Sequence, residues 1–258
     1  MNSNFIGCFS AEWIKKRRSF SSWLVIAGGL FVPVISVIIF FVYPKQLLAI
    51  HASGHFWNML FQKSWQMMAF MLLPMGLVLA VSLVTQLEFK NNSWKQVHTS
   101  PVLYSHIYFS KLLVLLLMLV QLFLVFNTGI WISAWIPSLL ISDIPYPDYA
   151  FNYGKILTLN AGYFIGSLPL LALQYMISLQ FRNFLVPVGT GLALIIGGMI
   201  ALTWKYIYMV PSAYTALYFL QSTESTAPAH SLTYWSLGYF LTFTFLGYWL
   251  YISRKVKG

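Results

Sequence analysis

Six apolar stretches, separated by shorter polar segments, dominate the chain. A helix that crosses a lipid bilayer needs about 20 mostly apolar residues at about 1.5 Å each. The stretches that meet this requirement are residues 23–43, 66–86, 111–135, 156–179, 184–204 and 234–252. The pattern predicts an all-α integral membrane protein with six transmembrane helices, in one domain that covers residues 1–258.

The composition agrees with a membrane protein. Of the 258 residues, 59% are hydrophobic and only 8% are charged, whereas soluble domains have about 25% charged residues. Aromatic residues reach 18%, which is typical of side chains that anchor helices at both membrane interfaces. His51 and His55 have a spacing that suits a metal on a helix. No cysteine or acid lies beside them and Gly54 interrupts, so no metal site is predicted.

The basic residues are unevenly distributed. With the N-terminus inside, the inner side holds Lys15, Lys16, Arg17, Arg18, Lys90, Lys95, Lys111, Arg182, Arg254, Lys255 and Lys257, and the outer side holds Lys45, Lys63, Lys155 and Lys205. Lysine and arginine are enriched in cytoplasmic loops. This distribution predicts cytoplasmic termini. It also explains the net charge of +10 as a signal for orientation in the membrane, with no nucleic acid as partner.

The first residues predict an amphipathic helix in the membrane interface. Phe5, Phe9 and Trp13 are spaced to share one helix face. The basic cluster that follows consists of Lys15, Lys16, Arg17 and Arg18. Such a helix is typical of the cytoplasmic membrane surface. The alternative interpretation is an ordinary basic flank before the first transmembrane helix.

Two further segments are apolar but are not predicted to cross the membrane. Residues 47–62 are expected to lie on the outer surface, and residues 206–221 are expected to form a re-entrant or interfacial helix. Within the predicted spans the notable polar residues are the amides Gln121, Asn127, Asn160 and Gln174. Such amides usually form hydrogen bonds between helices, and the alternative is that they line a transport pathway.

The polar segment between the second and third predicted spans, residues 88–110, is the strongest candidate for a functional site. Lys90 and the residues after it predict a polar turn, and Trp94 and Val97 predict the apolar side of a short helix. Thr99, Ser100 and Pro101 then predict its end and the start of a new helix. The segment is therefore expected to present a short helix to the cytosol. The alternative is a solvated loop whose lysines only set the topology.

This segment resembles the cytoplasmic loop of ABC-2-type transporter permeases. The resemblance lies in the pattern Glu88-x-Lys90-x-Asn92-Ser93-x-Lys95-x-Val97-x-Thr99-Ser100-Pro101, followed by Ser110-Lys111-Leu112-Leu113. Ser93 stands where threonine is usual and Val97 where leucine is usual. The size of the chain is similar to that of small permeases of bacteriocin-immunity and peptide-efflux systems.

The resemblance implies a multi-pass permease of the bacterial cytoplasmic membrane. Such a permease pairs with a second permease, of the same or a related chain, and binds a cytosolic ABC ATPase dimer. The loop would be a coupling helix, in which Glu88 orients the segment, Trp94 and Val97 form the docking face, and Lys90 and Lys95 pair with acids on the ATPase.

The sequence predicts no enzymatic activity and no cofactor bound by this chain. It lacks the phosphate-binding loop G-x-x-x-x-G-K-[ST], so ATP and Mg²⁺ are expected on the partner ATPase. Membrane lipid is the remaining expected partner. The sparse charge along the spans favours an amphipathic or hydrophobic substrate that is exported, such as a peptide, a lipid-linked molecule or a drug. A membrane scaffold without transport is the alternative function, and a membrane-embedded enzyme is disfavoured because no catalytic cluster is present.

Overall fold

The computed structural model describes residues 5–17, 19–52, 55–90, 102–141, 143–147, 153–223 and 232–253. All regular elements in this part of the chain are helices. Five of the helical segments described are long and apolar enough to cross a membrane: Phe20–Val42, Phe56–Leu87, Tyr104–Leu140, Tyr153–Gln180 and Leu185–Thr203. The helix α11, Leu232–Ser253, has 22 residues and is rich in tyrosine, serine and threonine. The predicted all-α membrane fold is confirmed.

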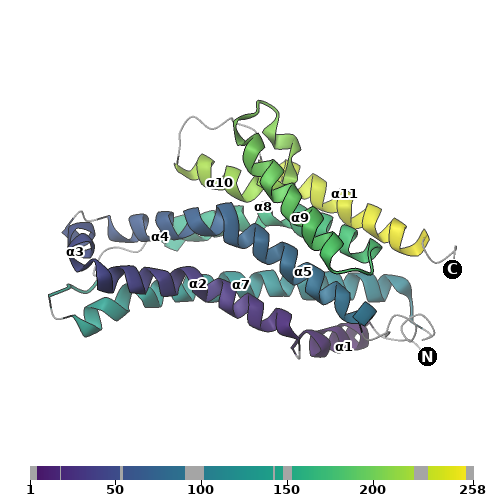
Figure 1. The fold of residues 1–258 in the computed structure, drawn as a ribbon, viewed down its shortest axis with the longest axis horizontal. Helices are drawn as coiled ribbons and strands as arrows, with labels where there is room; N and C mark the ends of the chain where they lie inside the picture. The colour runs from purple at the N-terminus through teal and green to yellow at the C-terminus, as the bar shows by residue number, and fades with distance from the viewer. Residues whose placement is uncertain are drawn as a thin grey trace.

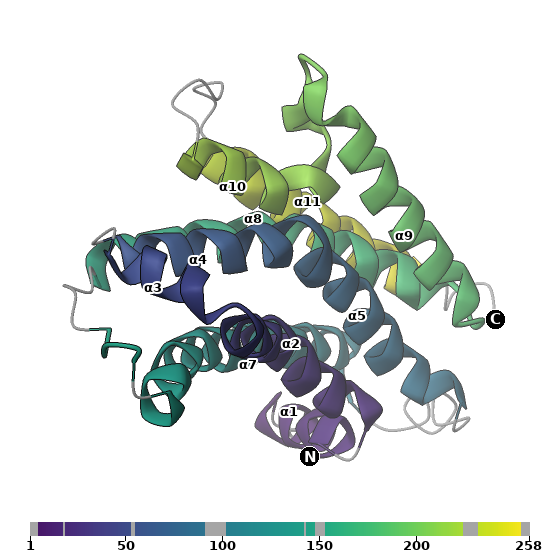
Figure 2. The ribbon, with the colours of Figure 1, turned by 60° about the vertical axis from the view of Figure 1, so that its left-hand side comes forward.

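Two long helix pairs form the body of the molecule. The helix α2 (Phe20–Val42) packs along α7 (Tyr104–Leu140), and α11 packs along α8 (Tyr153–Gln180). Between them lies α5 (Leu73–Lys90), which contacts α2, α8 and α9 (Leu185–Ile200). Figure 2 shows this order, with α9 on the far side of α5 from α2. Close approach of α2 and α7 depends on Gly129, where a Cβ atom would lie 2.7 Å from Cγ of Pro33.

The second span is longer than the sequence pattern predicts. The helix α4 (Phe56–Met67) runs through a π-helical turn, η1 (Met68–Leu72), directly into α5. Of residues 47–62, which were predicted to lie on the outer surface, residues 56–62 are instead the first turns of this long helix, and Leu47 and Phe56 are each 1% exposed. A short helix, α3 (Pro44–Ala52), connects α2 to this long span. The apolar character of the segment therefore reflects packing against the other helices.

The π-helical turn joins the second span to the segment before α11. In this turn the N–H of Leu73 donates to the carbonyl of Met68, five residues earlier. The same pattern would pair the carbonyl of Ala69 with residue 74, which is a proline without an N–H. The hydroxyl of Thr215 donates to this carbonyl at 2.7 Å. A side chain distant in sequence thus satisfies the backbone group that Pro74 leaves unpaired.

The segment after α9 turns back along α8. It contains three short 3-10 turns, η2 (Ala201–Thr203), η3 (Ile207–Met209) and η4 (Pro211–Ala213), and then α10 (Tyr214–Thr223). Tyr218 of α10 packs against Gly166 of α8, where a Cβ atom would lie 2.6 Å from its ring. As predicted, α10 is too short to span a bilayer. It covers the half of α8 that α11 leaves free (Figure 1).

One end of the bundle contains the N-terminal helix and the start of the predicted coupling segment. Figure 1 shows α1 (Phe5–Arg17), the last turns of α5 and the last turns of α11 at the same end of the molecule. We call this the terminal end. The predicted coupling segment begins here, because α5 ends at Lys90 and α7 starts at Tyr104.

Candidate functional site

The predicted coupling residues are only partly within the described structure. Glu88 and Lys90 belong to the last turn of α5. The predictions for Trp94, Lys95, Val97, Thr99, Ser100 and Pro101, and that for Arg18, fall outside the described residues. The short coupling helix therefore stays a prediction. What the structure does describe is how the helices on either side of this segment are held.

The N-terminal helix α1 packs mainly against α7. Phe5 meets the ring of His106 edge to face, with 6.0 Å between centroids. Phe9 stacks on Trp13, and both are partly buried against the core. The most buried side chains of α1 are polar, namely Glu12 at 7% and Lys16 at 4% exposure, whereas Ile6 is 72% exposed. The helix therefore attaches to the bundle through buried charges as well as through its aromatic side chains.

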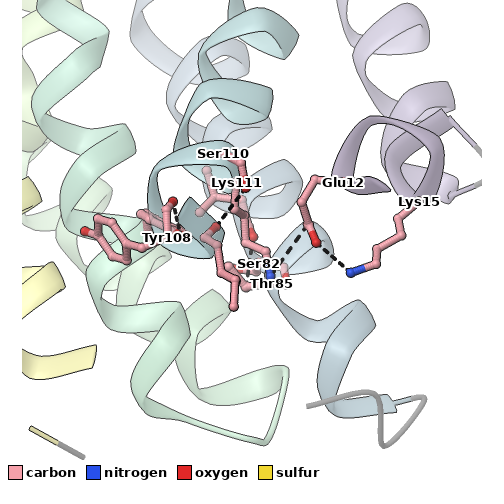
Figure 3. Close-up of polar contacts among 10 residues, drawn as sticks. Glu12, Lys15, Ser82, Thr85, Tyr108, Ser110 and Lys111 are labelled. Carbon is pink, nitrogen blue, oxygen red and sulfur yellow. Dashed lines mark hydrogen bonds and ion pairs between the residues drawn. The ribbon is translucent and has the colours of Figure 1, made fainter. Parts of the chain in front are cut away.

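Glu12 lies between two lysines. Its Oε1 is 2.6 Å from Nζ of Lys15, and its Oε2 is 3.8 Å from Nζ of Lys111 on α7. The Lys15 side chain is 38% exposed, whereas the Lys111 side chain is 2% exposed. Figure 3 shows the three side chains in a row, with Ser82 and Thr85 of α5 beside Lys111. Two helices, α1 and α7, thus meet at one buried carboxylate, and we call Glu12, Lys15 and Lys111 the acid–lysine junction.

Lys16 provides a second attachment of α1 to α7. Its Nζ donates to Oε1 of Gln121 at 2.6 Å and lies 4.7 Å from the centre of the Trp13 ring. Burial lowers the pKa of Lys16 from its usual value of 10.5, because the charged form loses hydration. The hydrogen bond and the aromatic ring partly replace that hydration. Arg17 is exposed at the end of the helix.

The other predicted amides also contact neighbouring helices. Asn127 of α7 and Asn160 of α8 exchange side-chain hydrogen bonds at 2.7 and 3.0 Å. Gln174 of α8 is fully buried and donates to the hydroxyl of Ser82 at 2.9 Å and to the carbonyl of Pro187 at 2.8 Å. Gln174 thereby connects α8 with α5 and α9. In this structure the amides hold helices together, and a role in a transport pathway stays a prediction.

Tyr108 connects the beginning of α7 with α8 and α11. Its hydroxyl donates to the carbonyl of Thr244 on α11 at 2.9 Å, and Tyr175 of α8 donates to the carbonyl of Tyr108 at 3.1 Å. Gln86, near the end of α5, donates to the carbonyl of Phe181 at 2.9 Å, just after α8. At the terminal end, side-chain hydrogen bonds therefore join α7 to α8 and α11, and α5 to the residue that follows α8.

Sequence reasoning missed Glu12, and it used Lys111 for the topology and for the family pattern without predicting a contact for it. A signal was present, because Glu12 is the only acid in the first 87 residues and lies beside a basic cluster. Its partner on α7 is about a hundred positions away, which no local pattern reveals. Within the described ranges, no group of three or more His, Cys, Asp or Glu side chains is placed to hold a metal ion.

Comparison with known protein families decides the class of this membrane protein. Residues 8–200 match the family described as ABC-2 family transporter protein. The chain belongs to the ABC-2 transporter family. Searches of curated proteins and of solved structures gave no match. The matched region runs from α1 to the end of α9 and so includes the acid–lysine junction.

Family membership determines the general role of the chain. An ABC-2 membrane domain is the permease subunit of an ABC transporter, and ATP hydrolysis belongs to an associated ABC ATPase. The terminal end is then the part of interest, because it contains α1 and the two helices that flank the predicted coupling segment.

Proposed function

We propose that this permease works in an ATP-driven exporter and that its terminal end receives the movement of the ATPase. The observation that carries the proposal is the acid–lysine junction. Lys111 lies shortly after the predicted coupling segment, and its buried ammonium group faces Glu12 of α1 at 3.8 Å. A push on the segment would displace the first turns of α7, and the buried ion pair would carry α1 with them.

The remaining contacts at the terminal end support a coupled movement of the bundle. Gln86 binds α5 to the α8–α9 connection, and Tyr108 binds α7 to α11. Packed helices joined by such contacts move as rigid bodies with a few discrete arrangements. ATP-driven closure of the ATPase would bias one arrangement over the other. The path would then open outward for an amphipathic or hydrophobic substrate.

The docking surface on this chain is proposed from the sequence. Trp94 and Val97 would form an apolar patch, and Lys90 and Lys95 would pair with acids of the ATPase. ATP and Mg²⁺ would bind to the ATPase, and a second permease, identical or related, would complete the transporter in the cytoplasmic membrane.

The first test is purification of the tagged chain from native membranes in mild detergent. We expect an ABC ATPase with a phosphate-binding loop to co-purify in stoichiometric amount. The double variant Trp94→Ala/Lys95→Glu should reduce the recovered ATPase by about thirtyfold, because losing a tryptophan hot spot costs at least about 2 kcal/mol. The other Trp-Lys pair of the chain supplies a matched control: Trp204→Ala/Lys205→Glu, at an exposed position far from the terminal end, should leave recovery unchanged.

Two outcomes would contradict the proposal. Equal recovery of the ATPase with both double variants would remove the docking role of the Trp94 segment. A complex that contains the ATPase but whose ATP hydrolysis no amphipathic peptide or lipid-linked probe stimulates would favour the scaffold function over export.

A further inference from the structure

A cavity of about 190 Å³ lies between α2, α3 and α4, away from the terminal end. Most of its lining is apolar, with Val32 and Ile39 from α2, Leu47 from α3, and Phe56 and Leu60 from α4. An engineered apolar cavity of about 150 Å³ stays dry and binds benzene. The cavity between α2, α3 and α4 is therefore large enough to bury part of a hydrocarbon chain.

The cavity opens sideways along α2. Ile39 lines it and is 45% exposed, and Tyr43, also in the lining, is 54% exposed. The neighbouring side chains Val34 and Ile38 on the same helix are 52% and 55% exposed. An apolar face of a membrane-spanning helix that no other part of the described chain covers is in contact with lipid hydrocarbon. A lipid chain can therefore enter from the side without crossing a polar barrier.

One charged side chain completes this cavity. Lys63 of α4 belongs to the lining and is exposed, and no acid is present in the lining that the structure describes. Ser36, one of the two serines in the lining, donates its hydroxyl to the carbonyl of Val32 on the same helix at 3.0 Å. Lys63 thus provides a positive charge next to an apolar cavity. A long lysine side chain can reach from an apolar wall to the headgroup region.

We propose that this cavity binds one acyl chain of an anionic membrane lipid, whose headgroup pairs with Lys63. The apolar lining selects a hydrocarbon chain, and the lateral opening admits it from the bilayer. Lys63, with no acid among the described lining residues, selects a negative headgroup. This site does not depend on the proposed mechanism of export, because it lies at the opposite end of α2 from the acid–lysine junction.

The test is photo-crosslinking in nanodiscs that contain phosphatidylcholine and a diazirine-labelled phosphatidylglycerol, with labelled peptides mapped by mass spectrometry. Labelling should concentrate on lining residues of α2, α3 and α4. Filling the cavity with Ser36→Phe should reduce this labelling more than about tenfold. Excluding even two methylene groups of the lipid chain from the cavity has an effect of this size on binding. Ile39→Trp, at a more exposed position, should block the opening of the cavity and reduce the labelling in the same way. This second variant tests the proposal if Ser36→Phe does not fold.

The headgroup is tested separately. Lys63→Gln should lower phosphatidylglycerol labelling about fivefold, the factor that corresponds to about 1 kcal/mol for one lysine at an anionic surface. Labelling by a diazirine phosphatidylcholine should not change. The matched control is Lys205→Gln, because Lys205 is exposed and lies outside the cavity. This variant should change neither the phosphatidylglycerol labelling nor the phosphatidylcholine labelling. Equal labelling by the two lipids, or labelling that the folded Ile39→Trp variant retains, would overturn the proposal.

Discussion

The acid–lysine junction raises the question of which lysine is the stronger partner of Glu12. Distance and burial rank the two lysines in opposite order. Glu12 lies closer to Lys15, at 2.6 Å, than to Lys111, at 3.8 Å. Ranked by distance, Lys15 would be the stronger partner. Ranked by burial, it would be Lys111, whose side chain is 2% exposed against 38% for Lys15. We expect burial to decide, because water and salt screen an exposed pair strongly.

The perturbation is Glu12→Gln, which keeps the shape of the side chain and removes its charge. At 3.8 Å two unit charges attract by about 4 kcal/mol at an effective dielectric constant of about 20. Removing one partner of a buried pair costs about 3–5 kcal/mol, because the other charge stays buried and loses its counter-charge. We therefore expect Glu12→Gln to lower the free energy of unfolding by about 3 kcal/mol. The exposed Lys15 pair should contribute about 1 kcal/mol or less.

The assay is a pair of double-mutant cycles, read from reversible unfolding in detergent micelles. One cycle combines Glu12→Gln with Lys111→Met, and the other combines Glu12→Gln with Lys15→Met. The first should give a coupling energy of about 2–3 kcal/mol, since the double variant removes both charges of the buried pair. Amide hydrogen exchange of α1 should rise in Glu12→Gln and return towards the parent rate in the double variant with Lys111→Met.

Two results would refute this reasoning. A coupling energy below about 0.5 kcal/mol between Glu12 and Lys111 would mean that the two groups act independently. A larger coupling with Lys15 than with Lys111 would mean that distance, and not burial, ranks the two pairs. Either result would also remove the observation on which the proposed movement of α1 with α7 depends.

Two further predictions concern other parts of the bundle. His51 of α3 is 2% exposed and stacks on Phe56, and burial lowers its pKa from the usual 6.5. As the pH falls below 6.5, the unfolded state takes up a proton before the folded state, so the free energy of unfolding should fall by up to about 1.4 kcal/mol per pH unit. Unfolding measured between pH 7 and 5 should show a smaller decrease in His51→Phe, and the same decrease in both proteins would contradict the effect. Gly191→Ala should cost about 1–3 kcal/mol of stability, because its Cβ would lie 2.6 Å from Oε1 of Gln174. Gly189→Ala, with no atom within 4 Å of its Cβ, should melt at or above the parent temperature.

Local patterns account for the class of the fold and most of the spans. Apolar runs such as residues 111–135 and 156–179 lie within α7 and α8, because a helix in lipid must satisfy its own backbone and present apolar side chains whatever its neighbours are. The family resemblance in residues 88–113 is a local pattern too, and the family is confirmed over residues 8–200.

Contacts between distant residues were decided only by the tertiary structure. Residues 56–62 read as a surface segment, but they form the start of the second span, because their apolar side chains pack against helices far away in sequence. The carbonyl that Pro74 leaves unpaired is satisfied by Thr215, and Glu12 pairs with Lys111. Hydropathy depends on each residue and its near neighbours, whereas burial of a charge or a lone carbonyl is tolerated only where a partner from another helix is in place.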